Sequence, residues 1–180
     1  MARLMPRVGR LFHPSIHPTL RMYQFQCVRS LLFLLSVCGC FGGHDEQRLG
    51  RDGVIAQSRR NNCGPAALAM LLSARGIFVS ADELERRMQP GPRGVSLATI
   101  VTTARAYGVP LDSWRLRFDA LDTLTTPAIL WIDGDHFVMF DSLTSAGAYL
   151  QDPATGRVLV PRHRLHERWD GTAAVLSPSP

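Results

Sequence analysis

An uninterrupted apolar segment from Ala66 to Leu72 constrains the fold of this 180-residue chain more than any other feature. It follows the sequence Asn62-Cys63-Gly64-Pro65, in which Asn62 suits a helix N-cap and Pro65 suits the first turn. Gly76 can end the helix. Alanine, leucine and methionine fill every position of the segment, so a helix formed by it has no polar face. We therefore predict a buried helix that other elements must surround.

The rest of the pattern predicts helices first and strands second. Ser80 to Glu83 forms a capping box, and Ser96 begins a further helix with apolar residues on one face. Short β-rich segments separated by turn sequences then follow, at 128–132, 136–140, 148–151, 157–160 and 173–176. This order predicts an α+β fold in which N-terminal helices pack on a C-terminal antiparallel sheet. Two tryptophans of this region, Trp131 and Trp169, are expected in its core.

The charge of the chain is concentrated at its N-terminus. All 20 basic residues are arginines, and the formal net charge is +5. Residues 1–40 hold five arginines and no acid, whereas the remainder is formally neutral, so the excess charge predicts no nucleic-acid partner. Without lysine, the sequence excludes a Walker P-loop, a Schiff base and a lysine general base.

Residues 1–40 are typical of an export signal. Arg29 precedes an apolar core from Leu31 to Val37, which is too short for a membrane-spanning helix, and small residues follow. Gly39-Cys40 resembles a lipobox, which predicts lipid attachment at Cys40 and a cell-envelope location on the periplasmic or extracellular face. A plain cleaved signal is the alternative, and Met22 is a candidate for the true start.

The signal sets the expected domain boundaries. We expect a tether at 41–52, an ordered domain at 53–176 and a polar tail at 177–180. Once residues 1–40 are assigned to export, Cys63 is the one cysteine left, which excludes a disulfide within the domain. No Cys-x-x-Cys pair with zinc spacing occurs, so no metal or other cofactor is expected.

Cys63 is the candidate nucleophile. The start of a helix offers unpaired N–H groups and the positive end of the helix dipole, both of which favour a thiolate. Its base would be His136. If a hairpin pairs Phe140 with Ala148, the same register places His136 opposite Asp152, which could orient the ring. Gln57 lies six residues before Cys63, where its amide could donate to an oxyanion.

Each of these residues also has a structural interpretation. Cys63 could be a small apolar residue behind a helix cap, and His136 a satisfied core histidine. Asp152 begins Asp-Pro-Ala-Thr-Gly, a common turn sequence. Neither interpretation of His136 and Asp152 accounts for the spacing that brings the two together across a hairpin.

In order along the chain, these residues resemble peptidase family C39, the double-glycine leader peptidases of papain-like fold. The resemblance rests on Gln57-x5-Cys63-Gly64-Pro65-Ala66, Gly94-Val-Ser-Leu97, Ala128-Ile129, His136-Phe137-Val138, Asp152-Pro153-Ala154-x-Gly156 and Trp169-x-Gly171. It implies Cys63 as nucleophile, His136 as base and acid, Asp152 as orienting residue and Gln57 in the oxyanion hole. Asn62 departs from the aspartate that is usual in members joined to ABC exporters.

The resemblance implies a cysteine peptidase that hydrolyses a peptide bond in a leader or precursor peptide through an acyl-enzyme. We expect a stand-alone, lipid-anchored member with a peptide or protein substrate and an export system as a possible partner. Two alternatives stay open. One is a C39-like module that binds a peptide without cutting it, and the other is a thiol-dependent transpeptidase or acyl transferase.

Overall fold

The computed structural model of the chain describes residues 46–124 and 127–178. The expected signal at 1–40, with Cys40 and Met22, lies outside these residues. In chain order the elements are β1 (Gln47–Gly50), α2 (Cys63–Ala74), α3 (Ala81–Met88), α4 (Leu97–Ala106), β2 (Leu111–Arg115), the 3-10 helix η2 (Phe118–Asp122), β3 (Ala128–Ile132), β4 (His136–Leu143), β5 (Ala148–Asp152), β6 (Gly156–Val160), α5 (Arg162–Arg168) and β7 (Trp169–Leu176).

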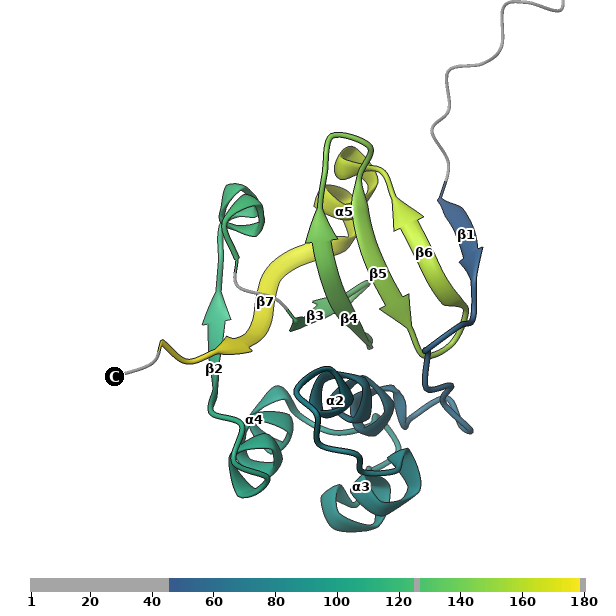
Figure 1. Cartoon of the computed structure of the whole chain (residues 1–180), viewed down its shortest axis with the longest axis vertical. Coiled ribbons are helices and arrows are strands. Elements are labelled where there is room, and N and C mark those ends of the chain that lie inside the picture. Colours follow the sequence, from purple (N-terminus) through teal and green to yellow (C-terminus); the bar gives the residue numbers. More distant parts are fainter. Residues whose placement is uncertain (1–45, 125–126, 179–180) are drawn as a thin grey trace, which may run out of the picture. The chain divides into compact units, whose positions relative to one another are not determined.

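The predicted apolar helix is α2, and its burial confirms the prediction. Every residue from Cys63 to Leu72 is buried, because α2 packs against α3 and α4 and also against β3 and β4. Figure 1 shows these three helices gathered at one side of the sheet. The helix ends where predicted, since Gly76 follows it with a φ of +78°, in the left-handed region that favours glycine.

The other two helices of this layer begin at the predicted serine caps. The Ser80 hydroxyl accepts a hydrogen bond from the Glu83 N–H at 3.2 Å, and the Ser96 hydroxyl accepts one from the Thr99 N–H at 3.1 Å. Both helices turn their apolar residues towards α2 and expose their polar face.

Among the described residues, none of the helices combines the length and the apolar character that a membrane span needs.

The seven strands form one antiparallel sheet in the order β1-β6-β5-β4-β3-β7-β2. Successive side chains point to opposite faces, so Ile129 joins the apolar cluster around α2, whereas Leu130 joins a second cluster with Leu121 and Leu165. The second cluster is covered by η2 and α5. Helices packed on an antiparallel sheet confirm the predicted α+β fold.

The two edge strands were not predictable from hydrophobic alternation. All residues of β1 are exposed, and β2 buries only Leu111, because each strand pairs through its backbone with one neighbour. The prediction of a tether over 41–52 is wrong for 47–50, where β1 pairs with β6. The ordered domain therefore begins before Gly53. Two inner strands are also longer than predicted, since β4 extends to Leu143 and β7 begins at Trp169.

Candidate active site

Cys63 is the first residue of α2 and only 4% of its surface is exposed. Its backbone N–H is one of the helix-terminal donors that have no partner within the helix. The following residue has to be glycine, because a Cβ on Gly64 would collide with the side chain of Val95. The thiol thus lies where the dipole of α2 and its unpaired N–H groups favour negative charge.

His136 and Asp152 lie together, as the hairpin argument predicted. His136 begins β4 and Asp152 ends β5, and the distance from His136 Nε2 to Asp152 Oδ1 is 2.7 Å. The two side chains are only 17% and 8% exposed. Because Asp152 holds Nε2, the Nδ1 atom is the one left to exchange a proton with Cys63.

The predicted strand register is nevertheless wrong. Phe140 pairs with Leu150 rather than with Ala148, and a bulge between Phe140 and Ser142 moves Ala148 opposite Leu143. The physical reason is a longer β4 that ends in a tight turn at Thr144–Gly147. Near His136 the shift is two residues, which keeps side chains on the same face. His136 therefore meets Asp152 diagonally instead of directly.

The carboxylate of Asp152 accepts hydrogen bonds both from the turn that follows it and from His136. Its Oδ1 accepts hydrogen bonds from the Ala154 N–H and from His136, both at 2.7 Å. Its Oδ2 accepts a hydrogen bond from the Thr155 hydroxyl at 2.9 Å. The turn interpretation is confirmed by these contacts, and the same turn fixes the carboxylate that contacts the His136 ring, so the two interpretations of this residue do not exclude each other.

These contacts favour a charged His136. Burial of the ring opposes protonation, but hydrogen bonds and negative charge from Asp152 and Cys63 outweigh it and raise the pKa of His136 to about 10. Burial also opposes the charge on Asp152, yet the hydrogen bonds from His136, Ala154 and Thr155 hold the pKa of its carboxyl below the usual value. At neutral pH the ring is therefore an imidazolium beside the Asp152 carboxylate and the sulfur of Cys63.

Gln57 is joined to the same region through its backbone. Its N–H donates to the Pro153 carbonyl at 3.0 Å, which ties the segment before α2 to the turn that holds Asp152. The side-chain oxygen Oε1 is buried and has no hydrogen-bond partner among the described residues. No hydrogen bond in that part of the chain joins its side chain to Cys63, so its role in an oxyanion hole stays a prediction.

Asn62 positions the nucleophile in a way that differs from the predicted cap. Its side chain does not cap α2. Instead, Oδ1 accepts from the Arg59 N–H at 3.0 Å, and Nδ2 donates to Ser58 Oγ at 2.9 Å and to Glu85 Oε2 at 3.0 Å. The residue is 1% exposed. The asparagine gives Glu85 Oε2 a donor that an aspartate does not provide, while the Arg59 guanidinium pairs with Oε1.

A cleft of about 480 Å³ opens beside Cys63 and fits the size of a ligand pocket. Its lining includes residues that sequence reasoning did not select: Arg60, Asn61, Arg93, Trp131 and Asp135. Trp131 was expected in the core, but it is only half-buried and packs on Phe137 at a ring-centroid distance of 4.3 Å. Trp131 lies two residues after Ile129 in β3, so both side chains point to the face of the sheet that α2 covers. This spacing was the signal available in the sequence.

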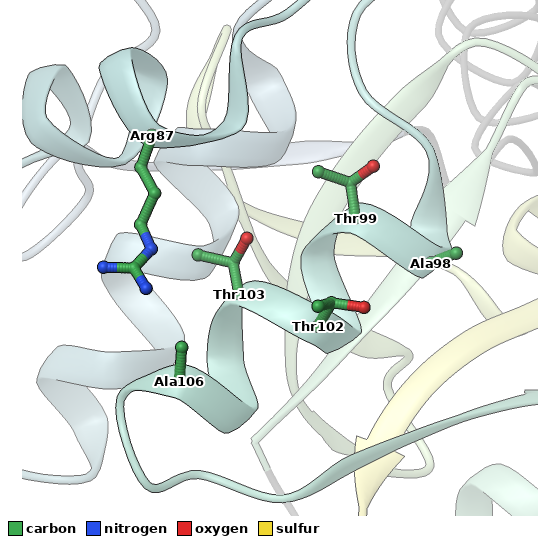
Figure 2. Close-up of a pocket in the computed structure, with 6 residues that line it drawn as sticks. All are labelled: Arg87, Ala98, Thr99, Thr102, Thr103 and Ala106. Carbon is green, nitrogen blue, oxygen red and sulfur yellow. The ribbon is translucent and has the colours of Figure 1, made fainter.

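A second hollow of about 450 Å³ lies between α3 and α4 (Figure 2). Arg87 comes from α3, and the other lining residues, alanines and threonines, come from α4. The two hollows are similar in volume, but their lining residues differ. The hollow between α3 and α4 is lined by no thiol, imidazole or carboxylate, whereas Cys63 lines the other. No cluster of three or more potential metal-ligating His, Cys, Asp or Glu residues occurs within 46–124 and 127–178.

Comparison with known proteins agrees with this geometry. The model of the Peptidase C39 family matches residues 51–180. The chain is 33% identical over 125 residues to the colicin V secretion/processing ATP-binding protein CvaB of Escherichia coli, which covers 69% of this chain and 18% of CvaB. It is 26% identical over 128 residues to an uncharacterized protein of Methanothermobacter thermautotrophicus, covering 71% of this chain and 90% of that protein. The chain thus spans about a fifth of the length of the exporter relative.

Solved structures show the same fold. A double glycine motif protease from an AMS/PCAT transporter, in complex with its leader peptide, superposes with a TM-score of 0.67 and 25% identity, covering 78% of this chain and 96% of the other. The peptidase domain of Streptococcus ComA, a bifunctional ABC transporter, superposes with a TM-score of 0.65 and 22% identity, covering 69% and 97%.

Proposed function

Because this chain belongs to the peptidase C39 family, we propose that it is a cysteine peptidase that hydrolyses a peptide bond through an acyl-enzyme on Cys63. One observation carries this proposal. A buried thiol at a helix N-terminus lies in contact with an imidazole whose other nitrogen is held by a carboxylate, at the edge of a cleft large enough for a peptide. Such a thiol, base and orienting group together form the machinery of nucleophilic catalysis.

In the proposed mechanism Cys63 and His136 form a thiolate–imidazolium pair in which the thiol proton is held on His136 Nδ1, and the thiolate attacks the carbonyl carbon of the scissile bond. The oxyanion accepts a hydrogen bond from the Cys63 N–H and, we expect, from the Gln57 amide. His136 then protonates the leaving amine, which breaks the peptide bond and leaves a thioester. Water, deprotonated by His136, hydrolyses the thioester and restores the thiol.

The proposed substrate is a precursor peptide with a double-glycine leader. The solved protease of the AMS/PCAT transporter is a double glycine motif protease in complex with a leader peptide, and CvaB is a secretion and processing protein. An export system is the proposed partner.

We also propose that the enzyme works at the cell envelope, held by a lipid on Cys40. The support is the sequence from Arg29 to Cys40. Growth with radiolabelled palmitate should label the wild-type chain and leave a Cys40→Ala chain unlabelled. Equal labelling of both chains would contradict the anchor and leave the peptidase proposal unaffected.

The test of activity compares Cys63→Ala and His136→Ala with His163→Ala, a matched histidine that is exposed on α5. With a double-glycine precursor as substrate, we expect the first two variants to lose hydrolysis and the third to keep it. Mass spectrometry of the products with an added amine separates hydrolysis from transfer. Peptide binding by the wild-type protein without any product would favour the non-cleaving module, and full activity of Cys63→Ala would refute the mechanism.

A further inference from the structure

The cleft beside Cys63 carries two arginines without an acidic partner. Arg60 precedes α2, and Arg93 lies in the turn closed by Gly91 and Gly94. Neither side chain makes an ion pair or hydrogen bond among the described residues. Eight other arginines of the described chain, at 59, 105, 115, 117, 157, 162, 164 and 168, each pair with a carboxylate, whereas arginines 48, 51, 75, 86 and 87 form no ion pair with a described residue and do not line this cleft. The two cleft arginines are thus available to a ligand.

Both arginines lie on one wall of the cleft, because the segments that carry them are joined. Asn61 Nδ2 donates to the Gly91 carbonyl at 2.9 Å. The same two segments also meet at Gly94, where an added Cβ would lie 3.2 Å from the Asn61 carbonyl oxygen. Arg60 and Arg93 are the chain neighbours of these contacts, so they lie on adjacent segments of backbone. The rings of Trp131 and Phe137, which contact each other at a tilt of 53°, come from the sheet and line the cleft from β3 and β4.

The charges around this wall define what it can bind. Asp135 is the one carboxylate among the lining residues, and it lies on the sheet side in the turn before His136. At the reacting centre the carboxylate of Asp152 lies against the His136 ring. The two arginines are therefore the unpaired positive charges of the cleft, and they attract an acidic side chain of a substrate. A guanidinium binds a carboxylate with two parallel hydrogen bonds, which also fixes its position.

We propose that Arg60 and Arg93 bind an acidic side chain of the peptide substrate near the scissile bond, so that the enzyme selects precursors carrying Asp or Glu there. The inference rests on the proposed function and adds a specificity to the same site. Such a contact sets the register of the peptide in the cleft, because one carboxylate is held at a fixed place relative to Cys63.

The test uses peptides that share a double-glycine core and differ at one position, which holds Glu, Gln or Lys and is moved along the two residues before the double glycine and the four residues after the cleaved bond. At one of these positions, we expect the wild-type kcat/KM to be about tenfold higher for Glu than for Gln, and lower again for Lys. Arg60→Gln and Arg93→Gln should each reduce the Glu-to-Gln ratio about threefold, and the double variant should bring it close to one.

A matched control and a salt series separate this contact from a general effect of charge. Arg75 is exposed just after the other end of α2, about 18 Å along the helix from Cys63, so Arg75→Gln should keep the wild-type ratio. The ratio should fall as NaCl rises from about 0.05 M to 0.5 M, because salt screens exposed charges. Charge reversal by Arg93→Glu should shift the preference towards Lys.

Two outcomes would overturn the proposal: equal cleavage of the Glu and Gln peptides at all six positions, or the same loss of preference in Arg75→Gln. If no peptide is hydrolysed, the proposed function fails instead. Fluorescence anisotropy with Cys63→Ala protein then tests the inference by itself. Tighter binding of the Glu peptide, lost in the arginine variants, supports it, and equal binding of Glu and Gln peptides refutes it.

Discussion

Replacing Asp152 by asparagine removes the negative charge beside His136 but keeps an acceptor for its Nε2–H. The rise in the pKa of His136 from 6.5 to about 10 corresponds to about 5 kcal/mol in favour of the imidazolium. This stabilisation is shared between Asp152 and Cys63 and is reduced by solvent around a ring that is 17% exposed. We assign about 2 kcal/mol to the charge of Asp152, which predicts that Asp152→Asn lowers the ratio of imidazolium to neutral imidazole at a given alkaline pH by about 30-fold, with a corresponding loss of kcat/KM on the alkaline side of the profile.

The pH dependence gives the sign of the effect. A carboxylate raises the pKa of the imidazolium, so Asp152→Asn should lower it and move the alkaline loss of activity to lower pH. Hydrolysis of a fluorogenic precursor peptide between pH 5 and 10 measures both quantities. Asp152→Ala, which also removes the acceptor, should lose about 10³-fold because the ring is no longer oriented. The reasoning would be refuted if Asp152→Asn had the kcat/KM of the wild type and lost its activity at the same alkaline pH.

Other predictions concern stability. Asn62→Asp should lower the free energy of unfolding by about 2 kcal/mol in urea titrations, because it replaces a donor to Glu85 with a second carboxylate, and adding Glu85→Gln should restore most of the loss. Gly64→Ala should lower it by about 1–3 kcal/mol through the collision with Val95, whereas an unchanged urea midpoint would contradict that contact. Because the pKa of His136 is raised on folding, its contribution to the free energy of unfolding is full below pH 6.5 and is lost towards pH 10. The thermal unfolding temperature of the wild type should fall over this pH range, and that of Asp152→Asn should fall less.

The elements that the sequence predicted are those whose burial leaves a pattern. The helix at Cys63 has no polar face, and the serine caps at 80 and 96 bond as their sequences indicate. The edge strand β1 has no such pattern, because it is exposed and pairs through backbone groups that every residue carries. Its pairing with β6 depends on tertiary context rather than on its own composition.

The sequence predicted that His136 and Asp152 lie together, but it predicted the geometry around them only in part. The spacing of His136 and Asp152 predicted their contact, which survived a wrong register because a shift of two residues preserves the face of a strand. The network of Asn62 was missed, since its partner Glu85 lies on another helix. The cleft was missed as well, because Arg60 and Arg93 become neighbours only through a contact between two loops.

Mass spectrometry of an acid-quenched single turnover tests the central claim most directly. Wild-type protein mixed with a double-glycine precursor should carry the acyl part of the substrate as a thioester, and peptide mapping should place it on Cys63. If His136→Ala is still acylated, the adduct should accumulate more in this variant than in the wild type. The adduct should be absent in Cys63→Ala. Product formation by a wild-type protein that carries no adduct on Cys63, or by Cys63→Ala, would contradict covalent catalysis by this thiol.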